Sequence, residues 1–185
     1  MPKQRGRPKK HTSRVSTERI IAAARRLTIA SGKLPSIRSI AAHLDVDPMA
    51  IYHYFESKQA LLEHMASSIV DAVYSPESGP DWENELCKLA ISYVDQLRKH
   101  PGLLEAMLAS PVVGPVVLFS ERFEAATADL ALSEPDRRHA LYLFVDYLHG
   151  FAYSATCAGA LADQLSTEEV TGPLRVLFRG MQPQD

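Results

Sequence analysis

Apolar residues recur every three or four positions along most of this 185-residue chain, a spacing that places them on one face of an α-helix. No segment alternates between apolar and polar residues in the manner of a half-buried β-strand. The first helical stripe has Ser16 or Thr17 as its cap and Gly32 as its stop, and consists of Ile20, Ala24 and Leu27. The pattern predicts an all-α protein.

Three short helices are predicted after the first, each begun by a residue whose side chain can accept a hydrogen bond from the backbone. Ser36 begins the second helix, Asp47 the third and Ser57 the fourth. Pro48 takes the first position of the third helix, where its missing N–H costs nothing. Asp45 separates the second helix from the third, because aspartate tolerates the left-handed geometry of a tight turn.

The segment YSPESGPD, residues 74–81, holds two prolines and a glycine and predicts a linker. The chain is therefore expected to divide into a flexible basic arm (1–14), a first helical domain (15–74) and a second helical domain (81–180). The stripes of the second domain predict helices over residues 82–97, about 103–109, 119–130, 135–160 and 166–179.

The helix predicted over residues 135–160 is unusually apolar. From His139 to Ala162 its one formal charge is Asp146, which predicts a helix buried on several faces. A membrane span is the alternative for this length, but Asp146, His149 and the hydroxyl groups argue against it. One stripe suits a core and consists of Leu141, Phe144, Leu148, Phe151 and Ala155. A second stripe suits the wall of a small-molecule pocket and consists of Tyr142, Asp146, His149 and Tyr153.

Charge is distributed unevenly along the chain, although the net charge is only −2. Residues 1–60 hold twelve Lys or Arg and four Asp or Glu, whereas residues 61–185 hold eight Lys or Arg and eighteen Asp or Glu. This asymmetry predicts that the amino-terminal part meets a polyanion. The two cysteines match no metal-ligand spacing, and the basic first residues are not followed by the apolar stretch of a secretory signal, so a reduced cytoplasmic setting is expected.

The second and third helices, with a supporting helix on either side, form the arrangement of a helix-turn-helix DNA-binding unit. With Ile51 and Phe55 turned inward, the other side chains near the third helix remain for thymine methyls, base edges and phosphates. Arg38 suits a bidentate guanine contact, and Lys58 lies where a helix N-terminus already favours a phosphate. The predicted DNA contacts of this unit are Ser36, Arg38, Pro48, Met49, Ala50, Tyr52, His53, Tyr54 and Lys58. The alternative is that the aromatic residues, above all Tyr54 and Phe55, only pack the domain.

The run SIRSIAAHLDVDPMAIYHYFESKQALL resembles the DNA-binding domain of TetR-family transcriptional regulators, in which an aromatic cluster, Ser-Lys and paired leucines follow the helix-turn-helix. The resemblance covers about residues 16–73. Asp45 departs from the glycine common at the family's turn, and Thr28 from the usual aromatic of its first helix. The resemblance implies a homodimer on a pseudo-palindromic double-stranded DNA operator, with a variable second domain that dimerises and binds a small effector.

The basic arm contains Arg5-Gly6-Arg7-Pro8, which resembles the core of an AT-hook. In such a core two arginines flank a glycine and enter a narrow A·T-rich minor groove. Arg5 and Arg7 are therefore predicted DNA contacts. The alternative is a basic tail that only aids solubility.

The segment DWENELCKLAISYVDQLRKHPG resembles, more weakly, the start of the effector domain of tetracycline-repressor-type proteins. An apolar or aromatic effector is expected, bound by Tyr93, Met107, Phe119, Phe123, Tyr142, Asp146, His149 and Tyr153. The alternative is that the polar members satisfy one another inside the bundle or at a dimer seam. Such a seam is favoured near the small residues Ala152, Ala155, Ala158, Gly159 and Ala160. No histidines have metal-ligand spacing, so neither a metal nor a cofactor is expected.

Three functions of different classes remain. The leading one is a ligand-responsive homodimeric repressor. A second is an architectural protein that binds A·T-rich DNA without sequence preference through its arm. A third is an enzyme that uses Cys157, His149 and Asp146, but no nucleophile motif or phosphate loop accompanies them, and no enzymatic activity is expected.

Overall fold

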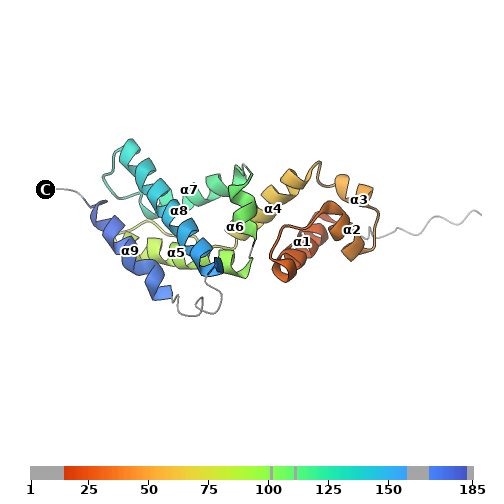
Figure 1. Cartoon of the computed structure of the whole chain (residues 1–185). Coiled ribbons are helices and arrows are strands. Elements are labelled where there is room, and N and C mark those ends of the chain that lie inside the picture. The colour runs from red at the N-terminus through yellow and green to blue at the C-terminus, as the bar shows by residue number, and fades with distance from the viewer. Residues whose placement is uncertain (1–14, 101, 111, 158–166, 183–185) are drawn as a thin grey trace, which may run out of the picture.

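The computed structural model describes residues 15–100, 102–110, 112–157 and 167–182, and within them every regular element is a helix. The molecule is elongated (Figure 1), with α1–α3 at one end, α5, α7, α8 and α9 at the other, and α4 and α6 between them. The all-α prediction is confirmed. The helices are α1 Thr17–Ser31, α2 Ile37–Leu44, α3 Pro48–Tyr52, α4 Lys58–Val70, α5 Trp82–Lys99, α6 Leu103–Leu108, α7 Gly114–Ala126, α8 Glu134–Cys157 and α9 Thr167–Arg179.

The predicted caps of the first four helices are confirmed by their hydrogen bonds. Ser16, Ser36 and Ser57 each accept from the backbone N–H three residues later, at 3.3, 3.1 and 3.0 Å. Asp47 accepts from the N–H of Met49 at 2.7 Å. Asp45 ends α2 with φ 55°, the left-handed geometry expected of it.

The third helix is shorter than the sequence suggested. It ends at Tyr52 after five residues, so His53 and Tyr54 lie in the turn that follows it. The backbone N–H groups of Tyr54 and Phe55 both donate to the carbonyl of Ile51, which closes that turn tightly. The aromatic run is therefore presented by a short helix together with a turn.

A first core lies among α1, α2, α3 and the start of α4, with Ile20, Ile40 and Ile51 at its centre. Phe55 is 1% exposed in this core and meets the ring of His64 edge-on at 5.2 Å. Thr28 is fully buried, and its hydroxyl donates to the carbonyl of Ala24 at 2.8 Å. The threonine, which departs from the aromatic residue that the sequence resemblance implied here, therefore leaves no unsatisfied polar group.

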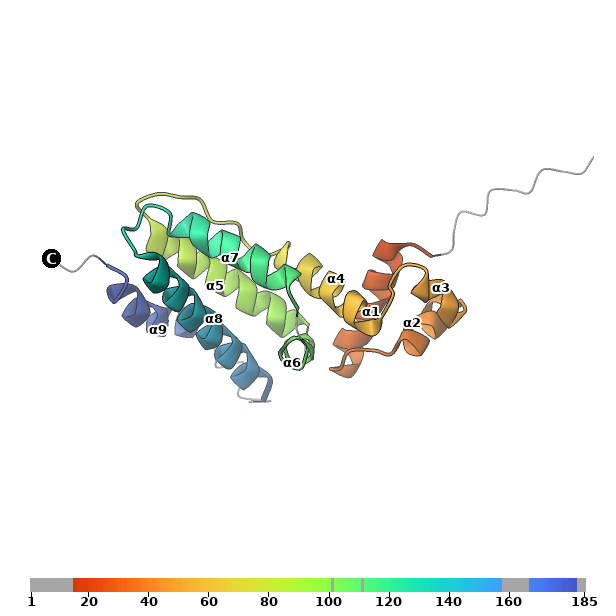
Figure 2. The ribbon, with the colours of Figure 1, turned by 90° about the horizontal axis from the view of Figure 1, so that it is seen from above.

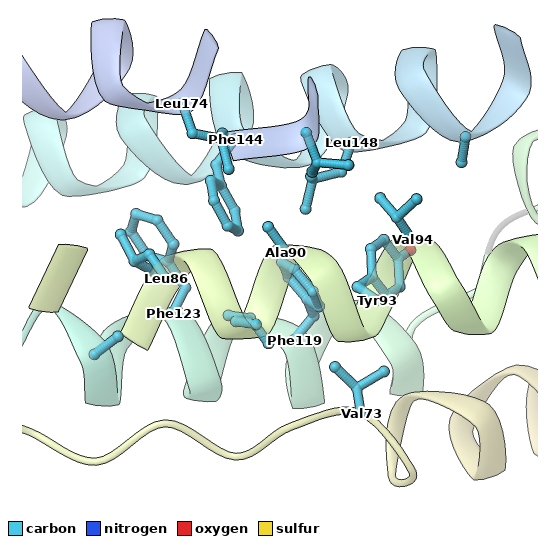
Figure 3. Packing of buried hydrophobic residues seen from close by; sticks show 14 of the residues in the cluster. Val73, Leu86, Ala90, Tyr93, Val94, Phe119, Phe123, Phe144, Leu148 and Leu174 are labelled. Atoms are coloured by element: carbon cyan, nitrogen blue, oxygen red, sulfur yellow. The ribbon is translucent and has the colours of Figure 1, made fainter. Parts of the chain in front are cut away.

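A second core fills the space between α5, α7, α8 and α9 (Figure 3). Phe119 and Phe123 of α7 reach toward Phe144 of α8, with ring centroids 6.1 and 5.5 Å apart. Helix α7 ends before Thr127, whose hydroxyl donates back to the carbonyl of Phe123. Leu130 was expected on this helix and instead lies in the turn beyond it.

Helix α4 connects the two cores. Leu61 and Met65 belong to the first core, and Val70 belongs to the second. Between them a third small cluster joins Leu62, Ala66 and Ile69 of α4 to Leu103 of α6.

Helix α8 departs from the prediction that it is buried on several faces. Its buried residues form one stripe, Ala140, Phe144, Leu148, Ala152 and Ala155, and side chains on the opposite side are exposed. Within the described residues, no helix is long and apolar enough to cross a membrane.

The connection between α4 and α5 lies against α5, and Glu85 holds it there. Its carboxylate accepts hydrogen bonds from the Tyr74 hydroxyl at 2.6 Å and the Glu77 N–H at 3.1 Å, and pairs with Lys88 at 2.6 Å. The Lys88 ammonium, the Tyr74 hydroxyl and the Glu77 N–H together lower the pKa of Glu85 to about 2.

Glu85→Gln is expected to remove part of the acid sensitivity of the fold. A carboxyl whose pKa is lowered by folding stabilises the folded state above its unfolded pKa, and that stabilisation is lost as the pH falls toward about 2. The variant should be less stable than the parent at pH 7 and should lose less stability between pH 5 and pH 3. Urea unfolding at each pH measures this, and Glu124→Gln, on the exposed side of α7, is the control. Equal pH dependence in parent and variant would contradict the assignment.

Candidate DNA-binding surface and ligand cavity

The residues around α3 expose a set of large side chains at one end of the molecule. Met49 is 62% exposed, Tyr52 44% and Tyr54 41%, whereas Ile51 and Phe55 are buried beneath them. His53 is also exposed, and Pro48 and Ala50 are half-buried. Apolar and aromatic side chains gathered on a surface in this way mark a binding site more often than chance exposure.

Tyr54 has a structural contact as well as an exposed ring. Its hydroxyl donates to the backbone carbonyl of Val15 at 2.9 Å, which ties the turn after α3 to the residue that precedes α1. Phe55 packs in the core, as one alternative expected, while Tyr52 and His53 point to solvent. The structure thus separates the aromatic run into core and surface members.

The polar residues predicted to contact DNA lie near this surface, but they differ in their exposure and in the hydrogen bonds that they already make. Arg38 on α2 and Lys58 in the first turn of α4 are exposed. The Ser36 hydroxyl caps α2 and also lies 2.6 Å from the Ser39 hydroxyl, so it is already engaged. Arg5 and Arg7 lie outside the described residues.

A cavity of about 220 Å³ opens between α5, α6, α7 and α8. Six of the eight residues predicted to bind an effector line it: Tyr93, Met107, Phe119, Tyr142, Asp146 and His149. The remaining lining residues, which the sequence did not single out, are Pro115, Val116, Ser120, Leu141 and Val145. Most of this wall is apolar, which is typical of sites for small organic molecules.

Two residues predicted for the cavity do not line it. Phe123 is fully buried in the second core against Phe144. Tyr153 lies farther along α8, beside a separate hollow near Gly32 and Gly102. The cavity covers less than three turns of α8, so Tyr153 lies beyond it. It also covers only one side of α7, and Phe123 lies outside that part of the helix.

The polar end of the cavity is formed by Tyr93 and His149. The Tyr93 hydroxyl lies 2.8 Å from Nε2 of His149. Burial raises the pKa of Tyr93, and burial lowers the pKa of His149 against the opposing effect of Asp146. Burial therefore favours the neutral form of both groups, and the imidazole tautomer sets which of the two donates.

Helix α7 forms one wall of the cavity and also holds α4 at two points. The Glu63 carboxylate of α4 accepts from the N–H groups of Val113 and Gly114, at 3.3 and 3.1 Å, at the start of α7. At the other end Arg122 of α7 donates to the carbonyls of Val70 and Asp71, where α4 ends. We call these two contacts the α4–α7 clamps.

Gly114 lies close to α4 at the first clamp. A β-carbon at this position would lie 2.8 Å from the Ser67 hydroxyl oxygen, so a larger residue would require that hydroxyl to turn away. No sequence pattern indicated Glu63 or Arg122, because each bond joins residues about fifty positions apart. In the described part of the chain, no three His, Cys, Asp or Glu residues gather to hold a metal ion.

Residues 20–65 match the family model described as bacterial regulatory proteins, tetR family. Over this segment the chain is similar to the amino-terminal part of TetR-family regulators. The matched residues contain α2, α3 and most of α1 and α4, and thus the whole exposed surface described above. The family consists of transcriptional regulators.

Among curated proteins, the chain is 27% identical over 148 residues to the HTH-type transcriptional repressor DrrR1 of Streptomyces coeruleorubidus. The match covers 76% of this chain and 53% of DrrR1, so the chain spans about half the length of that relative.

Several solved structures share the fold. BioQ of Mycobacterium smegmatis is 24% identical with a TM-score of 0.75, and covers 90% of this chain and 98% of its own. A structure of BioQ with its natural double-stranded DNA operator is 25% identical, with a TM-score of 0.71 and the same coverage. A single-residue variant of TetR from Acinetobacter baumannii AYE, in complex with minocycline, is 21% identical with a TM-score of 0.74, covering 90% of this chain and 96% of its own.

Glu63→Gln is expected to loosen the start of α7. A hydrogen bond to a charged acceptor contributes about 1.5–3 kcal/mol, so the amides of Val113 and Gly114 should exchange roughly tenfold or more faster in the variant. Hydrogen-exchange mass spectrometry of peptides that cover the start of α7 measures this. Glu121→Gln, an exposed position on the same helix, should leave the exchange unchanged. If both variants behave like the parent, the Glu63 clamp does not hold α7.

Proposed function

We propose that this protein is a homodimeric, ligand-responsive transcriptional repressor that binds a pseudo-palindromic DNA operator in the cytoplasm and has no enzymatic activity. The observation that carries the proposal is the exposed surface around α3, with Met49, Tyr52 and His53 outward over a buried Ile51. Its occurrence within a TetR-family domain supports the reading, as do the repressor DrrR1 and the operator complex of BioQ.

In this proposal residues 15–74 form the DNA-binding domain and residues 81–180 the effector and dimerisation domain. The segment from Pro48 to Tyr54 enters the major groove, where Met49 and Ala50 meet thymine methyls and Tyr52 and His53 reach base edges or phosphates. Arg38 reads a guanine, and Lys58, with Ser36 and Tyr54, contacts the phosphate backbone. Arg5 and Arg7 of the arm (1–14) enter an adjacent A·T-rich minor groove.

Control by a ligand follows from the α4–α7 clamps. Four residues of α7 line the cavity: Pro115, Val116, Phe119 and Ser120. Helix α7 is also bonded to the second turn of α4 at Glu63 and to its C-terminal end. A ligand that shifts α7 therefore changes the position of α4, which leads directly into the DNA-binding domain. Such a ligand needs only a different affinity for the two positions of α4.

The dimer forms through the outward faces of α8 and α9, which lie side by side in both views of the molecule (Figures 1 and 2). On α8 this face carries the exposed Leu143, Gly150 and Ser154. On α9 it carries small or apolar side chains, among them Gly172 and Val176. Ala152 and Ala155, which the sequence placed near the seam, are instead buried within the chain, and residues 158–160 lie outside the described part.

An architectural role on A·T-rich DNA is the second candidate, because it needs only the basic arm. It leaves unexplained why the ordered surface around α3 exposes Met49 and Tyr52.

The test is a fluorescence-anisotropy titration against DNA from immediately upstream of the gene and a scrambled duplex, at two salt concentrations. We expect a preference of about 10³ or more for the upstream DNA. Arg38→Ala should reduce that preference by about 1–3 kcal/mol, whereas Lys58→Ala should weaken binding to both duplexes and lower the salt slope by about 1. Equal affinity for both duplexes, lost when residues 1–14 are deleted, would favour the architectural role instead.

The proposed dimer has its own test. Leu143→Arg places a charge on the outward face of α8 and should convert the protein to a monomer in analytical ultracentrifugation, because an unpaired buried charge destabilises an interface strongly. Val117→Arg, on the exposed side of α7, is the matched control and should remain dimeric. A Leu143→Arg protein that stays dimeric would place the seam elsewhere.

A further inference from the structure

The formal charge of the residues that line the cavity is negative. Asp146 carries the one formal charge among the lining residues, and none of them is Lys or Arg. His149 does not supply a positive charge at neutral pH, because burial lowers its pKa. An anionic ligand would therefore meet a carboxylate with no opposite charge in the wall to receive it.

Asp146 itself is available to a cation. The two ion pairs among the described residues join Lys88 to Glu85 and Lys99 to Asp95, so neither uses Asp146. Its side chain is exposed at the rim of the cavity. A positive group can approach it there without losing all of its hydration, and the large desolvation cost of burying a charge is avoided.

Aromatic rings reinforce this preference. Tyr93, Phe119 and Tyr142 line the cavity, and the first two lie with their ring centroids 4.6 Å apart. The faces of such rings carry negative electrostatic potential and attract cations. The Tyr93 hydroxyl lies 2.8 Å from Nε2 of His149, so it already has a hydrogen-bond partner within the protein.

We propose that the cavity binds a small apolar organic cation, an amine whose ammonium lies beside Asp146 while its aromatic or aliphatic body enters among Tyr93, Phe119 and Tyr142. This inference rests on the proposed function, since it names the chemical class of the effector. The cavity volume, about 220 Å³, lies below the roughly 300–1,000 Å³ of sites for drug-sized molecules, so the ligand is small or extends out of the mouth.

The test compares three probes of nearly equal size and different charge: phenethylamine, phenethyl alcohol and phenylacetate. Each is titrated into the full-length protein at pH 7 by ligand-detected NMR. We expect the amine to bind about five- to tenfold more tightly than the alcohol, and phenylacetate to bind most weakly. Asp146→Asn should bring the amine to the level of the alcohol, whereas Glu124→Gln, an acid on α7 outside the cavity, should not.

The proposal is overturned if the alcohol or phenylacetate binds as tightly as the amine, if Asp146→Asn keeps the preference, or if none of the probes binds. An operator titration of the same preparation, with and without saturating amine, distinguishes this failure from failure of the proposed function. If the amine binds in an Asp146-dependent way but leaves operator affinity unchanged, the ligand class is supported and the role of the amine as effector is refuted. A protein that binds no operator would refute the repressor alone.

Discussion

The burial of α4 by two different sets of helices is the constraint on which the arrangement of the molecule depends. One face carries Leu61 and Met65 into the first core, and later turns carry Ile69 and Val70 toward α6 and the second core. Because a packed interior resists small displacements, α4 cannot move against one set of partners without disturbing the other. The helix therefore relates the exposed surface around α3 to the cavity beside α7.

The α4–α7 clamps add polar contacts that set the position of α7 along α4. Hydrogen bonds depend on distance and angle, so the Glu63 carboxylate and the Arg122 guanidinium specify which part of α7 meets which turn of α4. Because α4 is held at its second turn and at its C-terminal end, a shift of α7 is expected to displace α4 with it. The proposed response to a ligand depends on this coupling.

Features that depend on neighbouring residues could be predicted from the sequence, whereas features that depend on contacts between distant segments could not. The caps at Ser16, Ser36, Asp47 and Ser57 and the left-handed turn at Asp45 depend on residues only a few positions apart, so the pattern alone predicted them. The helix-turn-helix pattern and the family resemblance supplied the role proposed for the exposed surface. By contrast, the rotation of α8 about its own axis is set by its neighbours, and so the expected burial on several faces was wrong.

The lining of the cavity could likewise be predicted only in part. Six of its lining residues could be named because aromatic and polar side chains stand out on apolar helices, but Phe123 and Tyr153 share those features and lie elsewhere. Residue type does not reveal where along a helix a cavity begins and ends. Pro115, Val116 and Val145 were missed for the opposite reason, since nothing distinguishes them from core residues until the helices are assembled.

The bond between Tyr54 and Val15 has a consequence for how much DNA the protein covers. Val15 is the first residue after the basic arm, and its carbonyl is fixed beside the turn that follows α3. The arm therefore starts at a defined point next to the exposed surface around α3, and its fourteen residues span at most about 50 Å when extended. A minor-groove contact by the arm would lie within a few helical turns of the half-site, at a distance limited by chain length. The footprint on DNA would then exceed that of the helix-turn-helix alone while its centre remained fixed by α3.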